Sequence, residues 1–506
     1  MRMESDLETF YKNKTIFLTG ASGFLGKVIV EKLLRATETK RIYILVRPKR
    51  DQDIKTRIAK WQSDPLYKLL LENKPNAFER IAVIAGDCQE PDLGISAEDC
   101  ELLYGEAEIV IHSAATVSFT EPMHIALDVN TRATRLMLQL AKKMRNLLAF
   151  VHVSTAFSNC VIYHITERFY PEHLKSTASK ILMLRDQLEG NAIDSITTEM
   201  LGKFPNTYTY TKALAEQLVE TEAQDLPICI FRPGSIIATS KQPVSGWIDN
   251  IYGPIALIYG VAFGVLRVAT AIDNGNFIVV PVDSCANMVL CSAWRTAAEF
   301  KERQQRRSPP TIYNYVPHES NMIQQRDFKR MVEDKRFVYP VTQAIWYPFL
   351  HTTSKLWLFR LASIFYHLIP GFLVDVGLRL RGQKPRLLRT YKKIHSNIES
   401  IYSFTVNSWS FETHNTDALW KSLSERDRQL FEFDMKSLDW NSYFNRALCG
   451  MRTYLAKDDP SEESLQRARK RTMRFYILHR LLQFVLLCSA FAIVRWLFKS
   501  AMFSLK

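Results

Sequence analysis

The sequence lacks the patterns that would assign it to several common classes of protein. Its eight cysteines are scattered, without the paired C-x-x-C spacing of a zinc site or redox centre. It has no zinc-finger spacing, no aromatic RNA-binding motif and no basic region followed by heptads. Residues 1–14 contain no apolar run of the kind that a secretory signal needs. We therefore expect reduced, mostly buried thiols in a cytosol-facing protein, with no metal, no nucleic-acid partner and no cleaved signal.

Acidic residues are also in short supply. The chain has 66 Lys and Arg against 52 Asp and Glu, a formal net charge of +14. Such an excess favours an anionic partner, and with nucleic acid set aside, acidic lipid or a phosphate-bearing substrate remains. The length of 506 residues predicts two or more units.

One stretch, from Thr15 to Lys49, predicts a strand, a glycine-rich turn, a helix and a second strand in that order. The turn lets the backbone approach a diphosphate, and the helix from about Phe24 to Arg35 would aim its free N–H groups at that anion. This arrangement is a Rossmann-type dinucleotide cradle. Its candidate cofactor-binding residues are Thr19, Gly20, Ser22, Gly23, Phe24, Leu25 and Gly26.

The end of the second predicted strand, 42–46, favours NADPH as the cofactor. A free ribose 2′-hydroxyl usually meets a carboxylate at this point, whereas a 2′-phosphate meets arginine. Here Arg47, Lys49 and Arg50 follow the strand, and no acid occurs before Asp51. A solvated basic loop is the alternative interpretation.

Three further strands, at 81–85, 109–112 and 148–153, continue a doubly wound parallel sheet. Asp87 follows the first of them, where it would accept from an adenine amino group or simply close a turn. Ser113 and Ala114 follow the second and leave room for the nicotinamide ribose. A helix over 129–144 opens near Asn130, whose amide is placed to brace the neighbouring turn.

Candidate catalytic residues come later in the chain. Ser154 and Thr155 follow the fifth strand, at the sheet edge where ligands bind in open α/β folds. Tyr208 and Lys212 stand four apart at the start of a predicted helix, so both project from one face. A neighbouring ammonium favours the ionised phenol, which would let Tyr208 exchange a proton near neutral pH. Tyr210 points elsewhere on the helix and is expected to serve packing.

The motifs TGASGFLG, VHVSTAF, YTYTKALAE, FRPGSII (231–237) and GWIDNIYGP (246–254) together resemble the extended short-chain dehydrogenase/reductases. With HLIPGFLVDVGLRLRGQKPR (367–386) and DWNSYFNRALCGMRTYL (439–455), the resemblance is specifically to the eukaryotic fatty acyl-CoA reductases, and it covers nearly the whole chain. The first motifs specify only the superfamily, and the two C-terminal motifs narrow it to acyl reduction.

This resemblance implies reduction of a long-chain acyl-CoA to a primary alcohol with two NADPH. It implies that Arg47 contacts the 2′-phosphate, that Tyr208 is the acid, and that Lys212, also a cofactor contact, lowers the pKa of Tyr208. Thr155 is the preferred oxyanion hydroxyl, with Ser154 as the fallback. The segment from Ile165 to Lys203 resembles an insertion that would lie over the substrate.

Two apolar stretches, Trp247–Val268 and Ile345–Val376, are candidates for holding the fatty chain, with ordinary helical core as the alternative. Charged residues and prolines interrupt both, so neither is expected to span a membrane. The stretch 475–498 is apolar enough to do so, and the basic cluster 466–474 before it favours a cytosolic catalytic body. A buried amphipathic or hairpin helix is the alternative interpretation. We expect a single-pass C-terminal anchor in the endoplasmic reticulum, with the peroxisomal membrane second.

The expected architecture is therefore a Rossmann-type reductase domain over 1–335, a smaller helical domain over 336–460, and a basic linker with an anchor over 461–506. The partners expected are acyl-CoA, membrane lipid and, in an oligomer, a further copy of the chain. Three alternatives stay open: a membrane-bound reductase of a hydroxysteroid or another lipid or sugar-nucleotide substrate, an acyl reductase that stops at the aldehyde, and a non-catalytic NADP-binding scaffold.

Overall fold

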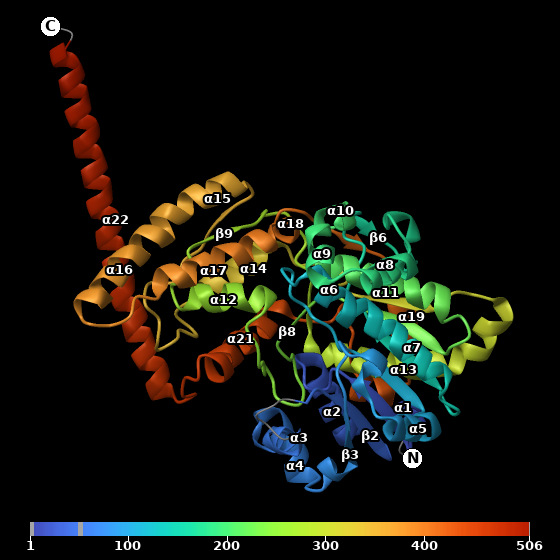
Figure 1. Cartoon of the computed structure of the whole chain (residues 1–506). Helices are drawn as coiled ribbons and strands as arrows, with labels where there is room; N and C mark the ends of the chain where they lie inside the picture. The colour runs from blue at the N-terminus through green and yellow to red at the C-terminus, as the bar shows by residue number, and fades with distance from the viewer. Residues whose placement is uncertain (1–4, 49–53, 505–506) are drawn as a thin grey trace.

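A parallel sheet of seven strands forms the centre of the protein (Figure 1). The computed structural model describes residues 5–48 and 54–504. The strand order is β11-β7-β5-β4-β1-β2-β3, so the chain starts in the middle, winds to one edge, and returns across β1 to the other. The strands are β1 (Thr15–Thr19), β2 (Arg41–Val46), β3 (Ile81–Ala85), β4 (Ile109–His112), β5 (Ala149–Val153), β7 (Ile228–Pro233) and β11 (Thr311–Tyr315).

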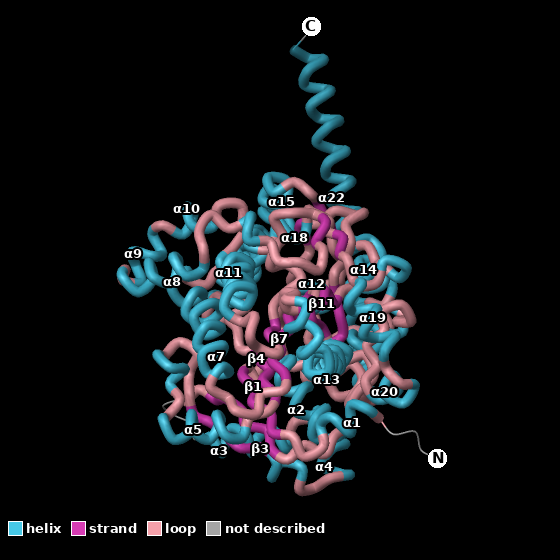
Figure 2. Tube along the Cα trace, turned by 90° about the vertical axis from the view of Figure 1, so that its right-hand side faces the viewer, coloured by secondary structure: helices cyan, strands magenta, loops and turns pink. Residues whose placement is uncertain are grey.

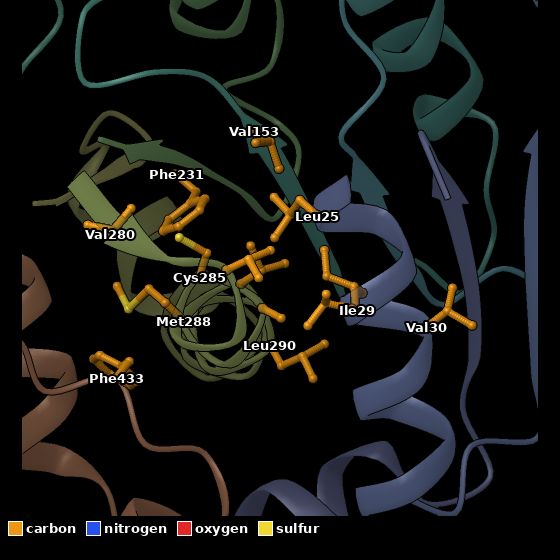
Figure 3. Close-up of a cluster of buried hydrophobic side chains, with 14 of the residues drawn as sticks. Leu25, Ile29, Val30, Val153, Phe231, Val280, Cys285, Met288, Leu290 and Phe433 are labelled. Atoms are coloured by element: carbon orange, nitrogen blue, oxygen red, sulfur yellow. The ribbon is translucent and has the colours of Figure 1, made fainter. Parts of the chain in front are cut away.

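Helices cover both faces of this sheet, as the side view shows (Figure 2). On one face, α2 (Phe24–Ala36) and α13 (Val282–Arg306) pack with the sheet, and their buried side chains are drawn in Figure 3. On the other face lie α5 (Ala97–Glu106), α7 (Ala133–Lys142) and α11 (Thr207–Glu222). Apart from the half-buried edge strand β3, the strands are buried on both faces, which explains why most form continuous apolar runs in the sequence.

The predicted strands coincide with observed ones, and the helix predicted over 129–144 differs in its start. It begins earlier, at α6 (Met123–Ala126), and continues through a π-helical turn, Leu127–Arg132, into α7. The sequence pattern misses this because the turn carries buried polar residues, Asp128, Asn130 and Thr131, whose partners lie in other elements.

The segment from Ile165 to Lys203 contains β6 (His164–Ile165), α8 (Ala178–Gln187), α9 (Gly190–Ser195) and α10 (Thr197–Leu201). Its apolar side chains, among them Ile181, Ile193 and Met200, belong to the same buried cluster as α7 and α11. The segment therefore packs against the outer side of α11, as Figure 2 shows.

The C-terminal third is mainly helical and is joined to the reductase fold by short parallel strand pairs. β9 (Val268–Thr270) pairs with β12 (His351–Thr353), and β6 pairs with β13 (Ser410–Phe411). Phe433, Tyr443 and Phe444 lie in the same core cluster as α2 and α13, so the two parts share one core. The helices here are α14 (Gln325–Asp334), α15 (Leu356–Ser363), α16 (Ile369–Leu380), α17 (Leu387–Ser400), α18 (Tyr402–Thr405), α19 (His414–Ser422), α20 (Glu425–Leu430) and α21 (Trp440–Gly450).

The last helix, α22 (Glu462–Ser504), projects far beyond the body (Figures 1 and 2). Its first turns pack on the body, where Ala468 and Thr472 are buried. From Leu481 to Ala501 all its described side chains are exposed, and most are apolar. The helix is long and apolar enough to cross a membrane, and it begins well before the predicted position 475 because the basic segment is part of the same helix. The remaining α-helices and strands are α1 (Asp6–Tyr11), α3 (Ile54–Ala59), α4 (Lys68–Asn73), α12 (Gly253–Ala262), β8 (Ser235–Ile237) and β10 (Val279–Pro281).

Candidate active site

The glycine-rich turn between β1 and α2 has the geometry of an anion cradle. Gly20 has a φ of +75°, and a Cβ there would lie 2.7 Å from the backbone nitrogen of Ala114. A Cβ on Gly26 would collide with the carbonyl oxygen of Gly20. The turn is thus held close both to the end of β4 and to its own helix, whose N-cap is Gly23. The free N–H groups of that helix end, beside exposed Ser22, suit a diphosphate.

Thr19 joins two strand ends. Its Oγ1 lies 2.8 Å from Nδ1 of His112 and accepts from the backbone N–H of Ala114 at 3.2 Å. Burial lowers the pKa of His112 to about 3, so this histidine is neutral at physiological pH. Thr19 was predicted as a cofactor contact. Its hydroxyl already has two protein partners, which positions Ser113 and Ala114 beside the cradle.

Arg47 and Asp87 meet at the ends of the paired strands β2 and β3, where Val46 lies beside Ala85. Arg47 Nε is 3.7 Å from Asp87 Oδ2, and the arginine side chain is 57% exposed. Asp87 Oδ1 accepts from the backbone N–H of Gln89, so this aspartate does close a turn. Its second oxygen, Oδ2, is the one near Arg47. Lys49, also predicted as a cofactor contact, lies outside the described residues.

Asn130 braces the turn after β4, as its position in the sequence predicted. Its Oδ1 accepts from the N–H of Thr116 at 3.0 Å, and its Nδ2 donates to the carbonyl of Thr116. The same Nδ2 donates to the hydroxyl of Thr211 on α11. One amide therefore fixes the cofactor-side turn relative to the helix that carries the candidate catalytic pair.

Tyr208 lies in the first turn of α11, where its ring stacks on Phe119 with centroids 5.8 Å apart. Burial raises its pKa to about 12, and a hydrogen bond with the Thr155 hydroxyl opposes that rise. This direction is opposite to the prediction that Lys212 holds the phenol pKa down. Removal from water outweighs the helpful partner, because a buried phenolate loses its hydration.

Lys212 follows one turn later, buried, with Nζ donating to the carbonyl oxygen of Val153 at 2.8 Å. Burial lowers its pKa to about 8, and the carboxylate of Glu216 opposes this. The contact ties α11 to the end of β5, which is the strand that delivers Ser154 and Thr155. Tyr208 and Lys212 thus lie on one face of α11, as their spacing predicted.

Glu216 is the third residue on this face and holds Ser154. The Ser154 hydroxyl donates to Glu216 Oε1 at 2.5 Å, and Asn159 donates to Oε2 at 3.3 Å. Arg232 donates to both carboxylate oxygens, at 2.9 and 2.7 Å, and is fully buried. The hydroxyl of Ser154 is therefore hydrogen-bonded to a buried ion pair, that of Glu216 and Arg232. The hydroxyl of Thr155 is hydrogen-bonded to Tyr208 instead.

An apolar cavity begins beside this pair. Phe119, which stacks on Tyr208, and Phe157, two residues after Thr155, both line it. The rest of its described wall comes from α12, α14, the region of α18, and the short strands β8, β9, β10 and β12 with their flanking residues. The lining residues that lie farthest along the chain are Ile401, Phe404, Thr405 and Trp409.

Both apolar stretches named in the sequence analysis contribute to these walls. The stretch Trp247–Val268 contributes through α12, with Leu257, Ile258 and Val261, whereas Ile345–Val376 contributes Leu350 and Thr352. The segment 165–203, which was predicted to lie over the substrate, supplies none of the described lining of this cavity. Its apolar residues are used against α7 and α11 instead. Tyr210, as predicted, serves packing: it is buried and contacts Phe204 edge to face.

Sequence reasoning missed Phe119, Phe404 and Glu216. The ring centroid of Phe404 lies 5.1 Å from that of Phe119 and 5.3 Å from that of Phe157. Nearly 250 residues of sequence separate Phe404 from Phe157. Aromatic residues in helices carry no signal for such a contact. The position of Glu216, four residues after Lys212, was the available clue, since it repeats the spacing of the candidate catalytic pair Tyr208 and Lys212.

A Rossmann sheet with a glycine cradle, a strand-end hydroxyl, and a tyrosine and lysine one turn apart defines an extended short-chain dehydrogenase/reductase. Comparison with known sequences is more specific. A family model described as "Male sterility protein" matches residues 18–289, and a second model of the same description matches 366–458. The chain is 40% identical to "Fatty acyl-CoA reductase wat" of Drosophila melanogaster, over 97% of this chain and 93% of that one. It is 34% identical to "Fatty acyl-CoA reductase 2" of Homo sapiens, over 94% and 91%. The chain belongs to the fatty acyl-CoA reductase family.

Solved structures share the fold at lower identity. The reductase domain of a nonribosomal peptide synthetase from Mycobacterium tuberculosis aligns with a TM-score of 0.57 at 19% identity, over 90% of this chain and 96% of that one. The terminal reductase domain of the myxalamid PKS-NRPS pathway aligns with a TM-score of 0.55 at 20% identity, over 87% and 90%. The shared fold thus extends beyond the Rossmann sheet.

Proposed function

We propose that this protein reduces a long-chain fatty acyl-CoA to the primary alcohol, with NADPH as reductant and release of CoA. The observation that carries this proposal is the apolar cavity that opens beside Tyr208 and Thr155 at the carboxyl edge of the sheet. A fatty chain in this cavity would bring its carbonyl end to the two hydroxyls, next to the cradle. The curated relatives named fatty acyl-CoA reductase support the same assignment.

The residues of the cradle fit a nicotinamide dinucleotide. The N-terminal end of α2 offers free backbone N–H groups to a diphosphate. Ser113 and Ala114 form the turn after β4 beside it, and Arg47 offers a guanidinium to a 2′-phosphate. When bound, the cofactor supplies the hydride for each of the two reductions. The guanidinium of Arg47 is exposed at the end of β2, and the sequence has no acid between that strand and Asp51. A cation without a carboxylate at this point supports NADPH over NADH.

In the first reduction, the hydroxyls of Thr155 and Tyr208 donate hydrogen bonds to the thioester oxygen as negative charge develops on it. Such preorganised donors act strongly in a site closed to water. The high pKa of Tyr208, about 12, keeps the phenol protonated and able to donate. Collapse of the thiohemiacetal then breaks the C–S bond, CoA leaves as the thiol, and the aldehyde stays beside the same two hydroxyls.

In the second reduction, Tyr208 gives its proton to the alkoxide as the aldehyde becomes the alcohol. Partial removal from water already raises the pKa of the Tyr208 phenol to about 12, so the charge left on it needs a nearby cation, and Lys212 lies one turn away on the same helix face. Lys212 Nζ donates to the carbonyl of Val153, which fixes the ammonium at the end of β5. Its role is therefore to support the tyrosinate during turnover.

We further propose that 1–335 form the reductase domain and 336–460 a helical domain that completes the cavity. Phe404 and Trp409 supply part of the cavity wall, which supports a role in substrate binding for the second unit. α22 would anchor the chain in a membrane with the catalytic body in the cytosol, and the basic residues of 466–474 support that orientation. The endoplasmic reticulum is the proposed compartment, with the peroxisomal membrane second.

The direct test is turnover by purified full-length protein in detergent or vesicles. Palmitoyl- or stearoyl-CoA is supplied with NADPH, and the products are resolved by gas chromatography. We expect alcohol, with two NADPH consumed for each alcohol formed. Absence of acyl-CoA-dependent NADPH oxidation at every chain length would overturn the proposal. Free aldehyde in place of alcohol, with one NADPH consumed, would leave the acyl reductase in place and remove the second step.

A further inference from the structure

The helix from α15 to α16 presents its apolar side chains outward. Together with the π-helical turn Ile364–Leu368, α15 and α16 form one apolar helix of 25 residues, Leu356–Leu380, which passes the length and composition test for a membrane span. Its large side chains are exposed to an unusual degree: Trp357 is 65%, Phe365 62% and Leu373 63% exposed. A contiguous surface of this kind needs an apolar partner.

The inward face of the same helix is the polar one. Every fourth residue is buried, and the stripe after Phe359 reads Ser363, His367, Gly371 and Asp375. A helix on the surface of a soluble domain has the opposite arrangement, with its apolar stripe toward the core. The reversal points to an apolar environment outside.

Specific contacts tie this polar face to the body, which favours a helix that stays against the body over one that crosses a bilayer. His367 Nε2 accepts from the backbone N–H of Arg267, and its Nδ1 lies 2.9 Å from Nε2 of His395. Gly371 allows the ring of Tyr391 to approach, since a Cβ would lie 2.9 Å from it. Asp375 caps α17 by accepting from the backbone N–H groups of Arg386, Leu387 and Leu388.

The surface beside the helix is strongly basic. Between residues 376 and 398 the chain has no acid and has seven exposed basic residues: Arg379, Arg381, Lys384, Arg386, Arg389, Lys392 and Lys393. Two of them, Arg389 and Lys392, rim a groove whose other walls are Leu368, Ile369, Phe372 and Leu388. A groove with apolar walls and two cations at its edge suits a phospholipid with an anionic headgroup.

The helix also lies beside the proposed anchor, as both views show (Figures 1 and 2). The ring centroid of Phe349 lies 5.9 Å from that of Tyr366 and 4.8 Å from that of His479 on α22. The Phe349 ring therefore contacts both the exposed helix and the anchor helix. On its inner side, Phe359 shares a buried cluster with Val261 and partly buried Leu350, which line the acyl cavity. The exposed helix thus packs, through Phe359, against side chains that line the cavity.

We propose that the helix Leu356–Leu380 lies in the membrane interface, as a second membrane contact beside α22, with anionic phospholipid bound along its basic flank. The arrangement seats the wall of the acyl cavity on the bilayer surface, where long-chain acyl-CoA partitions. This inference rests on the proposal that α22 is the anchor, and the experiment below separates the two.

The test places an environment-sensitive fluorophore on single cysteines of the full chain, in a background where exposed Cys449 and Cys488 are serine. The reporter positions are Phe372→Cys and Leu373→Cys. Phe491→Cys on α22, 70% exposed, reports on the anchor, and Met183→Cys, 61% exposed on α8, is the aqueous reference. Vesicles contain phosphatidylcholine with or without phosphatidylserine, and quenchers are either lipid-borne or aqueous iodide.

We expect lipid-borne quenching several-fold stronger at positions 372, 373 and 491 than at 183, and the reverse for iodide. Lipid quenching at 491 with only iodide quenching at 372 and 373 would overturn this inference and leave the anchor in place. Loss of lipid quenching at 491 as well would overturn the anchor proposal. Protection from both quenchers at 373, with cross-linking of two copies through that cysteine, would assign the face to self-association and overturn the inference.

The anionic component has its own arm. The double variant Arg389→Glu/Lys392→Glu should reduce lipid quenching at 372 several-fold in vesicles with phosphatidylserine, and much less in phosphatidylcholine alone. The matched control is Lys421→Glu on α19, a similar exposed lysine in another part of the C-terminal region, which should change neither. Equal effects of the double variant in both lipids would overturn the anionic-lipid assignment.

Discussion

The hydroxyl of Ser154 donates a hydrogen bond to Glu216, with 2.5 Å between Oγ and Oε1, and Arg232 completes the site as a buried cation. This hydrogen bond gives different roles to two hydroxyl groups, those of Ser154 and Thr155, which follow one another directly after β5. The Ser154 hydroxyl is hydrogen-bonded to the carboxylate of Glu216, which lies two helical turns after Tyr208. The Thr155 hydroxyl is hydrogen-bonded to the phenol of Tyr208 itself. The difference makes the two residues distinguishable by experiment.

Thr155→Ala should lower kcat by about 10²-fold or more, because it removes a donor to the developing oxyanion. Ser154→Ala should change kcat by only a few-fold and lower the free energy of unfolding by about 1 kcal/mol, since one buried hydrogen bond is lost. Steady-state assays with palmitoyl-CoA and urea unfolding of both variants provide the comparison. A larger loss of kcat in Ser154→Ala would reverse the assignment of the oxyanion hydroxyl.

Tyr208→Phe should abolish alcohol formation, with a loss of about 10²- to 10⁴-fold, because the proton donor is removed while the stacked ring on Phe119 is kept. NADPH binding, followed by its fluorescence, should remain. The control is Tyr210→Phe, on the same helix and buried against Phe204, which should retain activity. Unchanged turnover in Tyr208→Phe would favour the scaffold alternative or a different acid.

Deprotonation of Lys212 should cause the fall of kcat at alkaline pH. Its pKa is lowered to about 8 by burial, so the ammonium is charged below that pH and is lost as the pH rises through it. Tyr208, with a pKa of about 12, stays protonated over the same range. We therefore expect kcat to fall above about pH 8, and Lys212→Arg to move this limb upward, because guanidinium stays charged. An unmoved limb in an active Lys212→Arg enzyme would exclude Lys212 as its origin.

Arg47→Ser should raise the KM for NADPH by about tenfold or more, because one charge-assisted contact to the 2′-phosphate is removed. The KM for NADH should change little. Arg41→Ser is a matched control at the opposite end of the same strand, where the side chain donates to the carbonyl of Glu79. Equal losses for both cofactors would show that Arg47 does not recognise the phosphate.

Ala269→Leu should narrow the acyl cavity, which Ala269 lines. We expect kcat/KM for stearoyl-CoA to fall about tenfold, and that for decanoyl-CoA to fall less, since a short chain needs less of the cavity. Ala298→Leu, at an exposed position of α13, is the control for the added side chain. Equal losses at both chain lengths would place the fatty chain elsewhere.

Much of the fold and half of the candidate site could be predicted from sequence because their signals are local. The five predicted strands are five of the seven in the main sheet, since each is an apolar run followed by a turn. The cradle and the pairing of Tyr208 with Lys212 rest on glycine spacing and helical periodicity. The cavity wall could not be predicted in this way, because Phe404 meets Phe119 only through packing.

The direction of the pKa of Tyr208 was also beyond local reasoning. Spacing places a lysine near the phenol, which alone would lower that pKa. The degree of burial decides the sign, and burial follows from how α11 packs against elements far away in the chain. The same holds for the segment 165–203, whose apolar residues fit a substrate lid or a second layer on α7 and α11 equally well until the packing is known.

The sequence by itself thus determined the chemistry available to this protein: a dinucleotide cradle, a hydroxyl, a phenol, an amine and an apolar C-terminal helix. Tertiary structure decided how these groups are used. It bonded Ser154 to Glu216 and left Thr155 for the phenol, closed the cavity with residues from the C-terminal third, and turned the apolar face of Leu356–Leu380 outward. The physical reason is that hydrogen bonds and burial depend on neighbours that only folding brings together.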